Sequence, residues 1–333
     1  MREYRFDVVR VVCMTYIVTY VHLYGYIYPQ GRMTSFQPAS IALAHACLGL
    51  FTFVSGYLLG KKYQFGGKEG SNIWTFYKKR ILRVIPLFVL ASIALCFIGL
   101  NGMRATINGL LCISPFVDPK PMTLYYIPII LWCYLLTPLV ARHGLKWRVT
   151  CSLFLIAVLV AARLLFPSID SRFVFNVFFY FVGIISASCF DWKFKTSYGT
   201  SLKTLAVSAF TLLVAFAMYR SLLYSSATQM AVGFLGVFAI LFVCEGISHL
   251  LFDSPQPSRN GFRTVGCQLI SIISYASMCS YMFHRFFYWA AETIWNPIDT
   301  SVKWLYMIVV VYPIILVLSY GIQKCYDNMV KNY

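Results

Sequence analysis

The stretch RVVCMTYIVTYVHLYGY, residues 10–26, decides the fold class of this chain. It is apolar and aromatic over a length that can cross a membrane as one helix. It also holds His22 deep inside, with Arg10 at its start. An ionisable group in a membrane helix costs about 2.5–3.5 kcal/mol on insertion scales, so His22 requires an explanation.

The composition of the whole chain agrees with this first stretch. Of the 333 residues, 59% are hydrophobic and only 12% are charged, which excludes a soluble globular domain. The first apolar stretch is too long for the core of a signal peptide and has no A-x-A-like cleavage site. We therefore expect an integral membrane protein that retains its first helix.

Windows of about 20 apolar residues predict an all-α, polytopic protein with about ten membrane-spanning helices in one bundle. The predicted helices lie near residues 7–28, 39–60, 81–100, 123–141, 150–167, 173–190, 202–223, 227–251, 269–290 and 304–324. Ten crossings place both termini on one side of the membrane. With that side cytoplasmic, 20 of the 28 Lys and Arg residues lie inside and the other eight outside, as the positive-inside rule requires. We expect one membrane domain over residues 1–333.

The net charge of +17 is explained by this topology. The basic residues are not gathered in one soluble patch, so nucleic acid is not an expected partner, whereas the headgroups of the lipid bilayer are. Most of the 11 cysteines lie in apolar segments and form no C-x-x-C pair, so we expect small core residues and no metal site.

The stretch FYKKRILRVIP, residues 76–86, places Arg80 and Arg83 three residues apart on one helix face, directly after Lys79. Two guanidinium groups held so close, beside a glycine-rich inner loop, suit the binding of phosphate oxygens. Basic residues that stop transfer at a helix end explain the same pattern, and spacing alone slightly favours that explanation.

The second predicted helix ends LGLFTFVSGYLLGKK, residues 48–62. Ser55 and Gly56 would let a neighbouring helix approach closely, which is the favoured role for both. A nucleophilic role for Ser55 is weaker, because the G-x-S-x-G pattern is absent.

His22 lies 12 residues beyond Arg10, which corresponds to about 18 Å along a helix. A lone histidine in a helix is more often part of a hydrogen-bonded structure than a catalyst. Neutral imidazole is also the usual general base near pH 7, so the catalytic alternative stays open.

Taken in order, these stretches resemble the acyltransferase-3 family of membrane acyltransferases. The resemblance rests on F-D-x-x-R with a downstream histidine in the first helix, and on four later motifs. These motifs are S-G-Y-L-L at residues 55–59, K-R-I-L-R-V-I-P at 79–86, Y-Y-I-P-I-I-L-W-C-Y-L-L-T-P-L at 125–139 and I-S-Y-A-S-M-C-S-Y-M-F-H at 273–284.

The resemblance implies an enzyme that moves an acyl group, usually acetyl, from cytoplasmic acyl-CoA to a hydroxyl of a cell-surface or lipid-linked glycan. It implies a location in a bacterial inner membrane, with acetyl-CoA as the donor and no metal. The expected catalytic residues are His22 and Arg10, the expected donor-binding residues are Lys79, Arg80 and Arg83, and the expected substrate-binding residues are Tyr24, Ser55 and His284.

One spacing departs from the family pattern. The family usually leaves ten residues between the arginine and the histidine of the first helix, which places the two about 20° apart around an ideal helix. Here 11 residues intervene, which gives about 120°. A π-bulge accommodates one additional residue and would restore the common face, so we predict a helix irregularity between Arg10 and His22.

A function of a different class fits some of the same residues. A secondary transporter or a lipid-glycan flippase could use the buried histidines and Glu245 as a proton relay. No inverted repeat and no matching pair of broken helices in the sequence supports that alternative.

Overall fold

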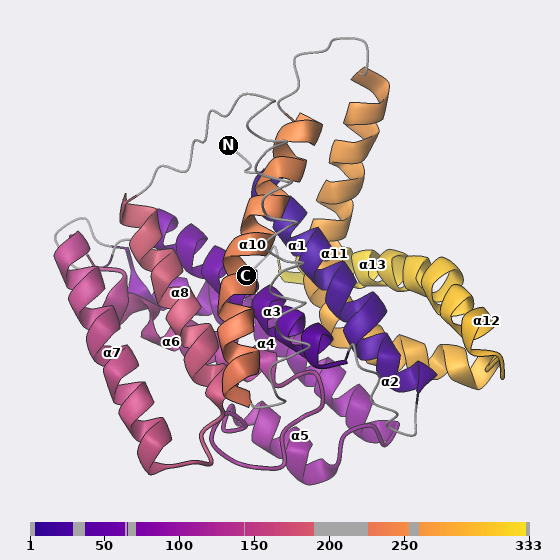
Figure 1. Cartoon of the computed structure of the whole chain (residues 1–333), viewed down its shortest axis with the longest axis horizontal. Helices are drawn as coiled ribbons and strands as arrows, with labels where there is room; N and C mark the ends of the chain where they lie inside the picture. Colours follow the sequence, from indigo (N-terminus) through magenta and orange to yellow (C-terminus); the bar gives the residue numbers. More distant parts are fainter. Residues whose placement is uncertain are drawn as a thin grey trace. The chain divides into compact units, whose positions relative to one another are not determined.

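The computed structural model describes residues 4–28, 37–63, 65, 71–142, 144–189, 226–252 and 260–330, and most of these residues are helical (Figure 1). In this part of the chain, seven helices are long and apolar enough to cross a membrane, and two shorter apolar helices accompany them. The predicted all-α, polytopic membrane fold is confirmed.

The chain divides into two compact units. The first comprises Met1–Cys47 and Phe194–Tyr333, and the second comprises Leu48–Lys193. Helix α3 (Gln37–Lys62) passes from the first unit into the second.

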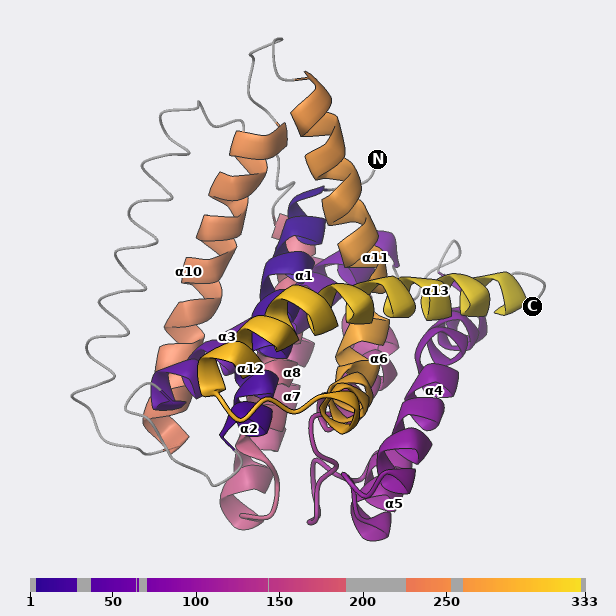
Figure 2. The same cartoon turned by 90° about the vertical axis from the view of Figure 1, so that its right-hand side faces the viewer.

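In the first unit, α1 (Tyr4–Tyr16), the π-helical turn η1 (Ile17–His22) and α2 (Leu23–Ile27) follow one another without a break. Helices α10 (Ser226–Phe252) and α11 (Asn260–Ile294) both pack against α1. The last segment consists of α12 (Thr300–Leu305), η3 (Tyr306–Val311) and α13 (Tyr312–Val330), and α13 packs against α11 and crosses it (Figure 2).

Two hydrogen bonds show that α1–α2 and α11 run in the same direction. Ser274 bonds to Asp7 near the beginning of the first helix, and His284 bonds to His22 near its end. Parallel directions agree with the prediction that the first and the ninth crossing both run outward.

In the second unit, the remainder of α3 is joined by α4 (Ile73–Phe97), α5 (Met103–Leu110), α6 (Tyr126–Val140), α7 (Leu145–Leu165) and α8 (Ser171–Cys189). Helix α8 packs against both α6 and α7 (Figure 1). Asn72 begins α4, because its side chain accepts a hydrogen bond from the Thr75 amide at 3.1 Å.

Helices α3 and α8 approach each other through glycine. A Cβ atom on Gly56 would overlap the Tyr180 carbonyl group, and one on Gly183 would overlap the Phe53 carbonyl group. Backbones can come this close only where side chains are absent, so the predicted packing role of Gly56 is confirmed.

Some predicted boundaries differ from the structure. The helix predicted near 202–223 lies outside the described residues. Helix α11 begins at Asn260 rather than near residue 269, because hydropathy marks only the apolar part of a helix and not its polar extension. The connection at residues 101–122 contains the short helix α5, which is too short to cross a membrane.

Candidate active site

A π-helical turn lies between Arg10 and His22. It spans Ile17–His22 and interrupts an otherwise α-helical segment. One π turn accommodates one additional residue, so the calculated angle between Arg10 and His22 returns from about 120° to about 20°. The predicted irregularity is confirmed.

Side chains supply hydrogen bonds to the backbone around this turn. The buried Tyr288 hydroxyl donates to the Val18 carbonyl oxygen at 3.2 Å, and the Thr19 hydroxyl donates to the Thr15 carbonyl oxygen at 2.7 Å. A wider turn disturbs the regular ladder of backbone bonds, and these hydroxyl groups compensate for it.

The end of the π turn brings His22 against His284 of α11. The His22 Nδ1 atom lies 2.8 Å from the His284 Nε2 atom, and the two rings are nearly parallel, with 7° between their planes. His284 is fully buried and His22 is partly exposed. Two residues 262 positions apart in sequence therefore form one hydrogen-bonded pair, which we call the histidine dyad.

The surroundings of His284 determine which nitrogen of His22 carries its proton. The His284 Nδ1 atom lies 2.8 Å from the Tyr281 carbonyl oxygen and 3.1 Å from that of Ser280. Carbonyl oxygens only accept, so Nδ1 of His284 is the donor, and in the neutral ring its Nε2 is the acceptor. His22 must then donate through Nδ1, which leaves a lone pair on its Nε2 atom. That atom can therefore accept a proton.

In this dyad, His284 can fix the orientation of His22, as the partner of a catalytic base does. A hydrogen bond at one nitrogen selects the tautomer and directs the other nitrogen at the substrate, as in catalytic triads. The sequence predicted His284 as a substrate-binding residue, but its ring already bonds to His22 on one side and to the backbone on the other.

Arg10 lies further towards the beginning of the first helix. Its Nη1 atom is 3.3 Å from the Asp7 carboxylate, which also accepts a hydrogen bond of 2.6 Å from the Ser274 hydroxyl. Asp7 is 4% exposed, whereas the Arg10 side chain is 30% exposed. Arg10 thus keeps part of its guanidinium accessible while a buried acid holds it in place.

Arg80 of α4, in the second unit, lies among three aromatic rings. Its guanidinium is 5.7–5.9 Å from the ring centres of Tyr63, Phe76 and Tyr134, within cation–π range. Its Nε atom is buried without a hydrogen-bond partner. Lys79 and Arg83 of the same helix are exposed.

The predicted substrate-binding residues Tyr24 and Ser55 lie in different units. Tyr24 contacts Tyr28 with the two rings tilted by 37°, and it lines a small cavity of about 40 Å³ with Tyr20 and Ser40. Because Tyr24 lies two residues after His22, this cavity is close to the dyad along the chain. Ser55 is partly exposed on α3, directly before Gly56.

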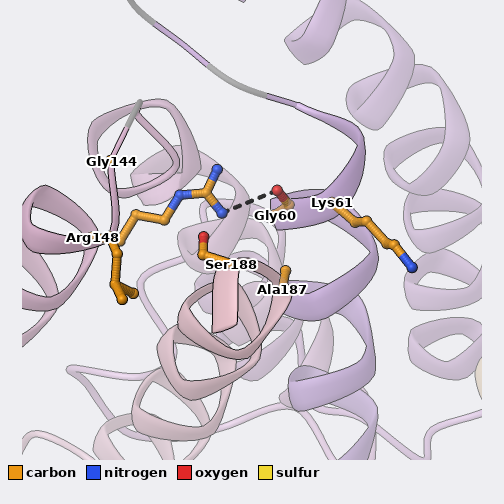
Figure 3. A pocket seen from close by; sticks show the side chains of 7 residues that line it. Gly60, Lys61, Gly144, Arg148, Ala187 and Ser188 are labelled. Atoms are coloured by element: carbon orange, nitrogen blue, oxygen red, sulfur yellow. Dashed lines mark hydrogen bonds between the residues drawn. The ribbon is translucent and has the colours of Figure 1, made fainter. Parts of the chain in front are cut away.

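The second unit contains a larger open cavity of about 420 Å³, lined by residues of α3, α7 and α8 (Figure 3). Arg148 lies at this cavity and donates to the Gly60 carbonyl oxygen at 3.1 Å and to that of Ile184 at 3.2 Å. Figure 3 shows that Lys61 extends away from Arg148. Arg148 therefore satisfies carbonyl groups near the ends of α3 and α8, a role that the sequence analysis missed.

The chemistry available at the dyad is proton transfer at a hydroxyl group. Among the described residues, no three His, Cys, Asp or Glu side chains lie together as a metal site would require. The sequence analysis missed the pairing of the two histidines and the proximity of Arg285 to Tyr26, because no local signal reports contacts between helices so far apart in the chain.

A comparison with known families agrees with the expected resemblance. A family model described as an acyltransferase domain, that of the acyltransferase-3 family, matches residues 3–324, which is nearly the whole chain. Comparisons with curated proteins and with solved structures give no significant match.

Proposed function

Because the chain belongs to the acyltransferase-3 family and is therefore a membrane acyltransferase, we propose that it transfers an acetyl group from cytoplasmic acetyl-CoA to a hydroxyl of a cell-surface or lipid-linked glycan. His22 is the general base of this reaction. The observation that carries the proposal is the hydrogen bond from His22 to His284, since it leaves the His22 Nε2 atom unprotonated.

The reaction requires a base for the alcohol proton and a stable position for that base. The acceptor oxygen attacks the thioester carbonyl carbon while the His22 Nε2 atom takes the hydroxyl proton. The tetrahedral intermediate then expels the coenzyme A thiolate, which receives the proton back from His22. His284 acts as a positioning residue that holds His22 in the required tautomer.

The donor is proposed to enter from the inner side. Lys79, Arg80 and Arg83 bind the phosphate groups of coenzyme A, because clustered guanidinium groups suit bidentate contacts with phosphate. Arg10, at the inner end of the first helix, is proposed to assist. The distance of about 18 Å from Arg10 to His22 along the helix is spanned by the extended arm of the coenzyme.

The acceptor is proposed to approach the dyad from the outer side. Tyr24 lines the small cavity beside the first helix and provides an aromatic surface for a sugar ring. Ser55 is retained as a candidate substrate contact because its side chain is partly exposed.

Transport with a proton relay has less support than acyl transfer. Glu245, the proposed carboxylate of such a relay, forms an ion pair of 3.5 Å with Arg5. This carboxylate is already paired with an arginine, and the family match favours acyl transfer.

The test is the rate of acetyl transfer from labelled acetyl-CoA by the purified protein, with transfer to added glycan and hydrolysis counted separately. The His22→Ala variant should lose about 10²–10⁴-fold in rate, because a positioned general base contributes that much. His45→Ala, which alters another membrane histidine, is the matched control and should keep its rate. Normal transfer by a folded His22→Ala variant would refute the proposed function.

A further inference from the structure

Arg285 directly follows His284 and reaches across to the helix that carries His22. Its Nη1 atom lies 4.0 Å from the position that a Cβ atom on Gly25 would occupy. Gly25 is three residues after His22, and residues three apart lie on the same side of a helix. The guanidinium therefore occupies the face of α2 that continues from His22, at a position where the chain has no side chain.

Tyr26 holds this arginine from two directions. The Tyr26 hydroxyl donates to the Arg285 carbonyl oxygen at 3.0 Å, and the Arg285 guanidinium lies 5.4 Å from the centre of the Tyr26 ring. Lys303 in turn donates to the Tyr26 carbonyl oxygen at 2.8 Å. The arginine is thus fixed before any substrate arrives.

The charge of Arg285 is not matched by an acid in the described part of the chain. None of the ion pairs there involves Arg285, and Glu292 on the same helix pairs with Lys303 instead. The Arg285 Nε atom is buried without a hydrogen-bond partner. A cation without an acidic partner is energetically costly in a membrane helix. A protein that keeps such a residue is therefore expected to have a function for it.

We propose that Arg285 is a catalytic residue that stabilises the oxyanion of the acyl transfer. The proposal rests on His22 being the base of that reaction. When the acceptor oxygen bonds to the thioester carbon, the carbonyl electron pair moves to the carbonyl oxygen, and the acceptor proton moves to the His22 Nε2 atom. Arg285 stays protonated and donates N–H groups to this oxygen until the C–S bond breaks and the carbonyl re-forms.

The position of Arg285 favours the oxyanion over a distant charge on the acceptor. It is the sequence neighbour of one dyad histidine and lies on the helix face of the other. A thioester placed for attack at His22 would develop its negative charge on the carbonyl oxygen, next to this guanidinium. Donors that are fixed in place and aimed at developing charge are the most effective, since they need no rearrangement during the reaction.

The experiment compares two donors, acetyl-CoA and fluoroacetyl-CoA, with wild-type protein and the Arg285→Gln variant. Loss of one oxyanion donor should lower kcat with acetyl-CoA about 10²–10³-fold. The loss should be smaller with fluoroacetyl-CoA, because its fluorine already stabilises the negative oxygen. Arg104→Gln, which alters an exposed arginine of α5, is the matched control and should behave as wild type.

The two donors separate a catalytic role from a structural one. A misfolded fraction, or a purely structural role, would reduce both rates by the same factor, and that result would overturn the proposal. A variant with unchanged kcat and a raised KM for the acceptor would also overturn it, because Arg285 would then bind the acceptor. If His22→Ala keeps its rate in the same assay, the proposed function fails whatever Arg285 does.

Discussion

Helices α1–α2 and α11 meet through polar side chains that are buried or partly buried, whereas α3 and α8 meet through glycine. In the first pair, Asp7 bonds to Ser274 and His22 bonds to His284, and a π turn brings the second contact into register. In the second pair, Gly56 and Gly183 let the backbones touch, and both helices stay regular at the contact. In the polar pair, the first helix is distorted by a π turn, and reactive side chains meet there. In the glycine pair, both helices stay regular and only their backbones come into close contact.

This contrast predicts different consequences of substitution. In the polar pair, changes should affect activity far more than stability. In the glycine pair, changes should affect stability first, and activity only as the folded fraction falls.

The largest effect is expected at His284. The His284→Ala variant loses the group that selects the tautomer of His22, so acetyl transfer should fall about 10⁴-fold, the order of the loss when a catalytic histidine loses its orienting partner. His284→Gln offers an amide oxygen as acceptor and should recover part of that rate. Kinetic assays at equal concentrations of folded protein measure the rates of both variants. Equal rates for His284→Ala and His284→Gln would show that the hydrogen bond to His22 does not determine the rate of acetyl transfer.

A large loss of stability is expected at Gly56. The Gly56→Ala variant places a methyl group against the Tyr180 backbone, which cannot move without separating the helices, so the free energy of unfolding should fall by about 3 kcal/mol or more. Thermal unfolding in detergent measures the change. Gly321→Ala in α13 is the control, since no atom lies within 4 Å of the added methyl group, and its stability should stay equal or rise. A Gly56→Ala variant as stable as this control would contradict the close contact.

A smaller effect is expected at Asp170, in the connection before α8. Burial alone would raise the pKa of this carboxyl, but the hydrogen bonds and charge of Arg172, together with Lys120, outweigh burial and lower it. A lowered pKa stabilises the folded protein above the unfolded pKa of about 3.9, and this contribution is lost as the pH falls through the folded pKa.

The Asp170→Asn variant should therefore be about 2 kcal/mol less stable than wild type at pH 7. The difference should shrink as the pH falls below about 5, which unfolding curves at several pH values can follow. Asp118→Asn is the control, because its side chain is 74% exposed and its loss should change little. A difference that is independent of pH would exclude the ion pair as the cause.

The smallest effect is expected from deleting Thr19 in the π turn. Ten residues would then separate Arg10 from His22, and a regular α-helix would keep both on one face. Acetyl transfer should stay within about tenfold of wild type, or about 1.4 kcal/mol. Deleting Ala276 from the regular part of α11 should instead remove activity, because no wider turn can absorb the change. If both deletions lowered the rate of acetyl transfer equally, the π turn would not be explained as the accommodation of one additional residue.

Much of the fold follows from the sequence alone. Apolar length predicts the helices because the bilayer sets their minimum span. The π turn is predicted because the spacing from Arg10 to His22 is one residue longer than the spacing that the resemblance to the acyltransferase-3 family implies. The role of Gly56 follows from its small size in an apolar helix.

The contacts between helices do not follow from the sequence. His284 is 262 residues from His22, and no periodicity within either helix reports that their rings meet. The same is true of Arg285 at Gly25 and of Arg148 at the Gly60 carbonyl oxygen. Such contacts depend on how the helices cross, which is a property of the packed bundle.

The most direct test of the central claim is the tautomer of His22, measured by ¹⁵N NMR of the protein labelled at histidine, with His22→Ala used for assignment. The account predicts that the resting protein carries the His22 proton on Nδ1 and leaves Nε2 unprotonated. A proton on Nε2 of neutral His22, with Nδ1 accepting from His284, would contradict it.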